Sequence, residues 1–308
     1  MTRPRRPDRL RPGDRVAVVA PAGPVQPDLL EAGVGILRDW GLHVEVGRHV
    51  LDRHPNLGYL AGTDQGRAAD LQRAWCDPTI AAVFCARGGY GSQRLLARLD
   101  WAAMARARPK ILAGSSDLTA LHVAFDHRLQ IVTLFAPMIA TRGFVDDPRA
   151  ADHLRRTLFH PEQTLVLRQP HTTALVPGRA EGLLYGGTLS LLAASIGNPG
   201  LAPPPTGALL MLEEVGEETY RLDRMLTQLL AAGWCEQVAG IALGSWTDCG
   251  PPEAVRATLV ERLASVGVPV VWELGFGHCA AALTIPLGVR ARMDADVGTL
   301  TLTEPALR

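Results

Sequence analysis

Two adjacent serines stand where a hydroxyl group could act as a nucleophile. Ser115 and Ser116 lie between Gly114 and Asp117, at the point where an apolar run gives way to a helical pattern. A serine at a tight turn from strand to helix can project its hydroxyl out of the sheet, while the first N–H groups of the helix face incoming negative charge. The GxSxG order of α/β-hydrolases is absent, and capping of the helix N-terminus is the alternative role of these residues.

A glycine-rich turn follows an earlier apolar run. Residues 87–91 read Arg-Gly-Gly-Tyr-Gly. Glycines tolerate positive φ and let backbone N–H groups approach a ligand closely, as an anion-binding nest or an oxyanion hole requires. The turn has neither the GxGxxG order of a dinucleotide site nor the Gly-Lys-Ser/Thr ending of a P-loop. A plain tight turn is the alternative interpretation.

Carboxylates and a histidine follow apolar runs in the second half of the chain. Glu213, Glu214 and Glu217 stand at or just beyond the end of one run, and His278 follows a later one. The ends of parallel strands are where α/β sheets place ligands and catalytic groups. Serine needs a base to become nucleophilic, and a carboxylate orients the histidine that serves as this base. The order Ser, Glu, His therefore permits a catalytic triad.

The elements that must position these groups alternate between strand and helix in the first half. We expect strands at 15–20, 43–47, 81–86, 110–114 and 131–135, and helices at 27–40, 63–75, from 92, at 117–127 and at 148–159. Such alternation is typical of a doubly wound α/β domain with a mostly parallel sheet.

The second half predicts a smaller α/β domain. Prolines between 160 and 180 interrupt the periodicity, so we expect an N-terminal domain at 1–165, a linker at 166–180 and a C-terminal domain at 181–308. Within that domain the pattern predicts a helix opening near 188, strands at 208–214, 238–244 and 269–274, and helices at 220–232 and 252–266.

Composition excludes several classes of protein. The 308 residues are 47% hydrophobic and 20% charged, and 31 basic residues balance 31 acidic ones. A balanced charge argues against binding to nucleic acid or to an anionic membrane. The five cysteines are scattered without a CxxC spacing, and we find neither a secretory signal nor an apolar stretch of membrane-spanning length. We therefore expect a cytoplasmic protein.

Six stretches together resemble the LD-carboxypeptidase family of serine peptidases, which includes muramoyltetrapeptide carboxypeptidases and the microcin C self-immunity hydrolases. They follow the family's order along almost the whole chain: RPGDRVAVVAPAGP at 11–24, GYLAGTDQGRAADL at 58–71, VFCARGGYGSQRLLARLD at 83–100, PKILAGSSDLTALH at 109–122, LEEVGEETYRLDRMLTQL at 212–229 and FGHCAAALTIPLG at 276–288. The resemblance implies two domains with the active site between them.

The resemblance also implies a role for individual residues. Ser116 would be the nucleophile, with Ser115 at a position where the family has an aromatic residue, and His278 would be the general base. Glu213 would orient the histidine. Glu214 and Glu217 remain as alternatives, although successive strand residues point to opposite faces, so Glu213 and Glu214 cannot both reach one imidazole.

Further site residues are expected around this triad. The oxyanion hole would consist of the backbone N–H groups of Asp117 and Gly89. A guanidinium matches a substrate carboxylate, but Arg87, Arg221 and Arg224 are equally open as its reader. His122 is expected to pack in the core, and Thr188 stands where the family's Gly-Gly-Asn has Asn. No metal or cofactor is implied.

The activity that the resemblance implies is release of terminal D-Ala from murein tetrapeptides during recycling of cell-wall peptides. The partner would be a small muropeptide substrate, and a homodimer is expected. Two alternatives remain. One is hydrolysis of an aminoacyl nucleotide, as in the microcin C self-immunity branch, and the other is a non-catalytic peptide-binding protein.

Overall fold

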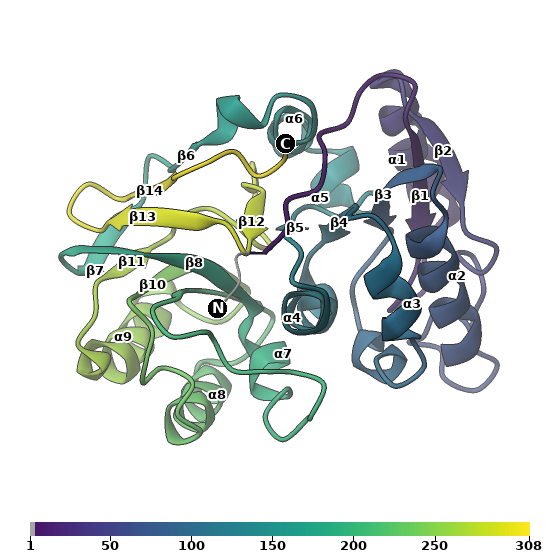
Figure 1. Ribbon diagram of the computed structural model, residues 1–308. Coiled ribbons are helices and arrows are strands. Elements are labelled where there is room, and N and C mark those ends of the chain that lie inside the picture. Colours follow the sequence, from purple (N-terminus) through teal and green to yellow (C-terminus); the bar gives the residue numbers. More distant parts are fainter. Residues whose placement is uncertain (1–3) are drawn as a thin grey trace.

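The N-terminal half forms the first of two sheets. The computed structural model describes residues 4–308, and Figure 1 shows this sheet on the right. Its order β12-β5-β4-β3-β1-β2 comprises β1 (Arg15–Val19), β2 (His43–Val46), β3 (Ile80–Cys85), β4 (Ile111–Gly114), β5 (Thr133–Phe135) and β12 (Ile285–Leu287). All neighbours are parallel except β12, which runs antiparallel to β5.

Helices cover both faces of this sheet. They are α1 (Pro27–Asp39), α2 (Asp64–Cys76), α3 (Trp101–Arg106), α4 (Thr119–Leu129), α5 (Arg142–Val145) and α6 (Pro148–Phe159). Alternate residues of β1 join different cores: Val16 and Val18 pack with Leu37 of α1, whereas Val19 packs with Leu71 of α2. The period of two along a strand explains this division, and it confirms the predicted doubly wound arrangement.

The second sheet has the order β6-β14-β13-β8-β9-β10-β11-β7 and a parallel centre from β8 to β11. Its strands are β6 (Val166–Leu167), β7 (Thr173–Val176), β8 (Arg179–Thr188), β9 (Leu209–Val215), β10 (Gly240–Thr247), β11 (Val270–Trp272), β13 (Arg290–Asp294) and β14 (Thr299–Leu302). The helices α7 (Leu189–Ala193), α8 (Thr219–Ala231) and α9 (Pro252–Leu263) lie below it in Figure 1. The predicted α/β class is confirmed.

Some elements differ from those expected. The helix expected from Ser92 is a short 3-10 turn at Ser92–Leu95, and α3 begins only after Asp100, whose side chain accepts a hydrogen bond from Ala103 N–H. The stretch 166–180 contains β6 and β7, which pair with β14 and β11. These strands make the stretch expected as a linker part of the second sheet. The division of the chain into two domains stays a prediction.

The two halves of the chain share structure. β12 comes from the C-terminal half and completes the N-terminal sheet beside β5. Asp147 at the start of α6 accepts a hydrogen bond from Ala281 N–H at 2.6 Å. One core cluster also contains Phe125 of α4 together with Tyr185 of β8 and Leu189 of α7. The halves therefore hold each other in a defined orientation.

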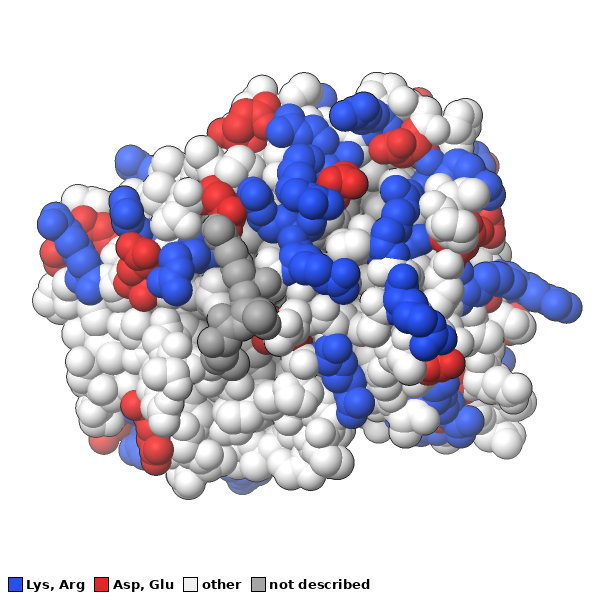
Figure 2. All heavy atoms as spheres, viewed as in Figure 1, with Lys and Arg blue, Asp and Glu red and all other residues white. Residues whose placement is uncertain are grey.

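Charged side chains are distributed unevenly over the surface. Figure 2 shows more basic than acidic side chains on one face. Several basic groups of the described chain have acidic partners, such as Arg9 with Glu162 at 3.1 Å and Arg156 with Asp152 at 2.9 Å. Since the whole sequence carries 31 basic and 31 acidic residues, acidic residues offset this excess elsewhere. Among residues 4–308, no helix combines the length and the apolar character that crossing a bilayer requires.

Candidate functional site

The predicted nucleophile stands in a strained turn at the end of β4. Ser116 has a φ of 60°, in the left-handed region that non-glycine residues rarely occupy. It opens a 3-10 turn that leads directly into α4, and its side chain is half-buried, whereas Ser115 is only 7% exposed. Backbone strain of this kind persists where the surrounding structure enforces it, and it is concentrated at functional sites.

The glycine turn lies directly against this serine. A Cβ atom on Gly88 would stand 2.8 Å from Ser116 Cβ and 3.0 Å from Ser116 Oγ. On its other side the turn is fixed to the loop after β1, because Gly23 N–H donates a hydrogen bond to Gly88 O at 2.9 Å. The N–H of Gly89 belongs to the next peptide along this turn. Only a glycine at position 88 lets the backbone come so close to the serine.

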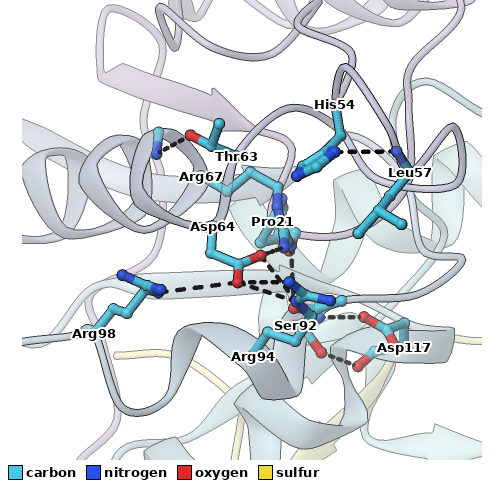
Figure 3. Close-up of polar contacts among 12 residues, drawn as sticks. Pro21, His54, Leu57, Thr63, Asp64, Arg67, Ser92, Arg94, Arg98 and Asp117 are labelled. Carbon is cyan, nitrogen blue, oxygen red and sulfur yellow. Dashed lines mark hydrogen bonds and ion pairs between the residues drawn. The ribbon is translucent and has the colours of Figure 1, made fainter.

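A buried arginine holds the glycine turn from behind. Arg67 of α2 is 1% exposed, and its guanidinium donates to Pro21 O and to Gly91 O, the latter at 3.0 Å. Asp64 pairs with Arg67 at 2.5 Å and with Arg94 at 2.9 Å. Figure 3 shows these groups converging between α2 and the turn.

A second set of contacts joins the turn to the serine loop. Ser92 N–H donates to Asp117 Oδ2 at 2.7 Å, and the Ser92 hydroxyl donates to the Asp117 carbonyl (Figure 3). Burial raises the pKa of the Asp117 carboxyl against the opposing effect of these hydrogen bonds. The two turns whose N–H groups were predicted to form the oxyanion hole are therefore braced against each other.

The predicted base and one carboxylate form a hydrogen-bonded pair in the C-terminal half. His278 Nδ1 lies 2.8 Å from Glu213 Oε2, and Glu213 is fully buried at the end of β9. Gly277 has a φ of 99°, and this lets the chain turn closely over the carboxylate. Burial lowers the pKa of His278, but the hydrogen bond and the charge of Glu213 outweigh this effect, so the pKa is raised above 6.5.

The two other carboxylates face elsewhere. Glu214 Oε2 accepts a hydrogen bond from Ser190 N–H of α7 at 2.7 Å, and burial raises its pKa to about 6. Glu217, which precedes α8, forms an ion pair at 3.1 Å with Arg221 of that helix. The alternation of β9 thus directs Glu213 to the imidazole and Glu214 to the opposite side. Of the three carboxylates that the sequence left open, Glu213 is the one in contact with His278.

Two threonines connect the serine turn to the histidine pair. Thr119 Oγ1 donates to Ser116 O at 2.8 Å and accepts from Thr188 N–H at 3.0 Å. The Thr188 hydroxyl donates to Glu213 Oε1. From the sequence we noted Thr188 only as a departure from the family pattern and did not single out Thr119. Its position three residues after Ser116, at the first turn of a helix, is the signal that could have found it.

A cavity of about 590 Å³ is lined by Ser115 and by His278, whereas the adjacent Ser116 is not among its lining residues. One side is formed by Ser115 and by the loop from Pro137 to Asp147, and the other by residues around His278. The lining residues are Ser115, Pro137, Met138, Thr141, Arg142, Gly143, Asp146, Asp147, Thr247, Gly277, His278, Cys279, Ala280 and Ala282. A second cavity of about 330 Å³ adjoins it through Thr247, Cys279 and Ala280.

Within residues 4–308, no hydrogen bond joins Ser116 Oγ to His278, and catalytic contacts are often longer without substrate.

The remaining candidates from the sequence lie outside this cavity. Arg87 donates to Pro24 O at 2.7 Å, Arg221 is paired with Glu217, and Arg224 stacks over the ring of Tyr220. The expectation that His122 packs in the core agrees with the structure, since its Nε2 lies 2.9 Å from the carbonyl of Gly114 and burial lowers its pKa to about 4.

No group of three or more His, Cys, Asp or Glu side chains in the described chain is arranged to hold a metal ion. The five cysteines are free thiols. The groups near the cavity are the Ser116 hydroxyl, which follows the lining residue Ser115, and the lining imidazole of His278 with its partner Glu213. Together they suit nucleophilic attack on a carbonyl carbon.

Comparisons with known proteins agree with this chemistry. The family models of the LD-carboxypeptidase N-terminal and C-terminal domains match residues 16–136 and 181–293. A Streptomyces coelicolor protein named "Putative carboxypeptidase" is 58% identical over 98% of this chain and 97% of its own length. The murein tetrapeptide carboxypeptidase of Pseudomonas aeruginosa is 36% identical over 92% of this chain and 94% of its own.

Solved structures share the fold. The muramoyltetrapeptide carboxypeptidase of Oxalobacter formigenes superposes with a TM-score of 0.78 at 27% identity, covering 94% of this chain and 97% of its own. An MccF-like protein of Bacillus anthracis superposes with a TM-score of 0.84 at 23% identity, covering 96% and 98%. The likeness extends over both sheets.

Proposed function

The chain belongs to the LD-carboxypeptidase family and is a serine-type carboxypeptidase, and from this premise we propose that it releases the terminal D-Ala of murein tetrapeptides by a Ser-His-Glu mechanism. Ser116, His278 and Glu213 carry the reaction in this proposal. The single observation that supports it most is the 2.8 Å contact between His278 Nδ1 and the fully buried Glu213.

In this proposal, the contact assigns the role of base to one nitrogen of the imidazole. Because Nδ1 is engaged by Glu213, Nε2 is the nitrogen that takes the proton from Ser116 Oγ as the hydroxyl attacks the substrate carbonyl. The carboxylate holds the required tautomer and stabilises the imidazolium that forms. The imidazolium then gives its proton to the leaving amine of D-Ala, and an acyl-enzyme remains on Ser116. Water, activated by the same histidine, hydrolyses this ester.

The oxyanion hole is proposed at the N–H groups of Asp117 and Gly89. Support comes from the contact between the glycine turn and Ser116, and from the hydrogen bonds of Ser92 that join this turn to Asp117. Donors that are already in position when negative charge develops on the carbonyl oxygen cost no reorganisation, and one such donor contributes about 3 kcal/mol to transition-state stabilisation.

The biological setting is part of the same proposal. Release of D-Ala from tetrapeptides would serve recycling of cell-wall peptides in the cytoplasm, with the enzyme acting as a homodimer. A relative named murein tetrapeptide carboxypeptidase supports the substrate class. Cell fractionation tests the location, and light scattering on the purified protein tests the dimer.

The decisive experiment uses a synthetic muramoyl tetrapeptide and measures free D-Ala. The wild-type protein should release D-Ala, Ser116→Ala should lose about 10³-fold or more in rate, and Ser115→Ala should keep most of it. A fluorophosphonate probe should label the wild type and Ser115→Ala but not Ser116→Ala. Absence of release by a folded wild-type protein would remove the assignment. Labelling that persists in Ser116→Ala would show that another residue is the nucleophile.

A second candidate function, hydrolysis of an aminoacyl nucleotide, is favoured by one observation. Tyr59 and Tyr90 are about half exposed, and their rings meet edge to face at 5.6 Å beside the glycine turn. Exposed aromatic rings are surfaces on which a nucleobase could stack. A relative of 25% identity is named microcin C7 self-immunity protein. Turnover of an aminoacyl-nucleotide analogue faster than of the tetrapeptide would select this function.

A further inference from the structure

A carboxypeptidase must recognise the free carboxylate at the end of its substrate, and the inference below rests on the proposed function. A planar guanidinium is the side chain best matched to a carboxylate, because two parallel N–H groups can donate to its two oxygens. The three arginines suggested by the sequence are engaged with Pro24 O, with Glu217 and with the ring of Tyr220. None of them lines either cavity of the site.

One other arginine does line the cavity that contains His278. Among the described residues that line the two adjoining cavities, Arg142 is the only arginine or lysine. It stands on the wall opposite the C-terminal half, together with Thr141 and Gly143 and in the same cavity as Ser115. A substrate carbonyl held between the serine turn and His278 would therefore lie beside the cavity that Arg142 also lines.

The backbone that carries Arg142 is firmly anchored. Arg142 is the first residue of α5, and the preceding Thr141 hydroxyl donates to Met138 O at 2.7 Å. Phe144 on the same turn is fully buried and packs edge to face against Trp40 at 5.7 Å. The side chain of Arg142 itself is 79% exposed. An anchored backbone and an exposed side chain allow the guanidinium to meet a ligand at the mouth of the cavity.

The charge of Arg142 is only partly neutralised. Nη1 lies 3.0 Å from Asp146 Oδ2, and this is an exposed pair of low strength. Asp147, the other carboxylate on the same wall, accepts hydrogen bonds from Arg149, Ala150 and Ala281 N–H groups. Both of its carboxylate oxygens are therefore engaged by backbone donors rather than by Arg142. The remaining edge of the guanidinium is available for a second carboxylate.

We propose that Arg142 binds the α-carboxylate of the substrate's C-terminal residue and so restricts cleavage to the last peptide bond. The chemical class of ligand is a peptide that ends in a free amino-acid carboxylate. In this role Arg142 contacts only the residue that leaves as the free amino acid, whereas the triad acts on the part of the substrate that remains bound to Ser116. Asp146 keeps the guanidinium at the mouth while the site is empty.

The test compares two substrates that differ only in the terminal group, a tetrapeptide acid and the corresponding C-terminal amide. In Arg142→Gln, we expect kcat/KM for the acid to fall about 10- to 100-fold, mostly through KM, as the loss of a charge-assisted bidentate contact predicts. For the amide we expect less than a threefold change. Arg142→Lys should retain part of the preference for the acid.

Arg179→Gln is the matched control. The side chain of Arg179 is similarly exposed, at 76%, and it pairs with Asp294 on the second sheet, outside the cavity. It should leave both substrates unchanged. An equal loss on acid and amide in Arg142→Gln, or no loss on either, would overturn the inference while leaving the peptidase assignment intact. Failure of the wild type to cleave either peptide would instead refute the proposed function.

Discussion

At the scale of single residues, the environment of Glu213 explains how a histidine near the surface can be adjusted for proton transfer. The carboxylate is fully buried and has two partners, the Thr188 hydroxyl on one oxygen and His278 on the other. A buried charge needs such partners, because leaving it unpaired costs several kcal/mol. The same contacts raise the pKa of His278 against the opposing effect of burial.

This arrangement predicts the pH dependence of a Glu213→Gln variant. The histidine acts as a base only when neutral, so kcat/KM should rise with pH through the pKa of His278. Without the carboxylate that raises this pKa, the acid limb of the profile should move to lower pH. The plateau should fall by about 10³- to 10⁴-fold, because the amide no longer holds the productive tautomer. A pH series of kcat/KM measures both effects.

Glu217→Gln serves as the control for this profile, since Glu217 pairs with Arg221 rather than with the imidazole. Its acid limb should coincide with that of the wild type. An acid limb in Glu213→Gln that stays in place or moves to higher pH would contradict the proposed role of this carboxylate.

At the scale of elements, the loops at the ends of β3 and β4 form one braced unit. Arg67 holds the glycine turn from behind, and Ser92 joins it to Asp117 beside the strained Ser116. The φ of Gly88 is not in the left-handed region. Position 88 therefore requires glycine because of the lack of space and not because of the backbone conformation. The space that a methyl group would need there is occupied by Ser116.

A Gly88→Ala substitution should therefore abolish most activity without unfolding the protein. The added Cβ would stand 2.8 Å from Ser116 Cβ, so the serine or the turn must move by several tenths of an ångström. A displacement of this size within an oxyanion hole should cost about 10²-fold or more in kcat. Steady-state kinetics measure the loss, and circular dichroism checks the fold.

Gly35→Ala is the matched substitution, because a Cβ at this position of α1 meets nothing within 4 Å. It should keep full activity and add about 1 kcal/mol of stability, since alanine favours helix over glycine. Wild-type activity in Gly88→Ala would mean that the turn does not constrain the serine.

At the scale of the whole molecule, the site depends on both halves of the chain at once. β12 leaves the C-terminal half to complete the sheet that carries the serine turn, and its Ile285 is fully buried. The core around Phe125 and Leu189 also continues from one half into the other. A strand shared in this way makes the folding of the two halves interdependent.

We therefore expect one calorimetric unfolding transition for the full chain, with equal calorimetric and van't Hoff enthalpies. Ile285→Ala should lower the midpoint of that single transition, because a buried large-to-small change costs about 2–5 kcal/mol. Val297→Ala, at a residue that is 61% exposed, should leave the midpoint unchanged. Two separate transitions in the wild type, only one of which responds to Ile285→Ala, would show that the halves fold independently.

The sequence by itself determined the class of fold and the family. Strand and helix periodicities are local properties, so the expected alternation and the boundaries of α1 and α6 lie close to those observed. The strand β8 was not expected, because Gly182, Gly186 and Gly187 interrupt its apolar pattern. The motifs along the chain indicated the family, which the comparisons confirm.

Tertiary structure alone decided which side chains meet. Three carboxylates were open from the sequence, and only the packing of β9 against the loop of His278 brings Glu213 to the imidazole. Arg142 carries no motif, and it lines the same cavity as His278 only because α5 and the C-terminal half pack beside each other. The physical reason is that contacts between residues distant in the sequence, such as Glu213 and His278, depend on how elements pack, and no local pattern encodes that packing.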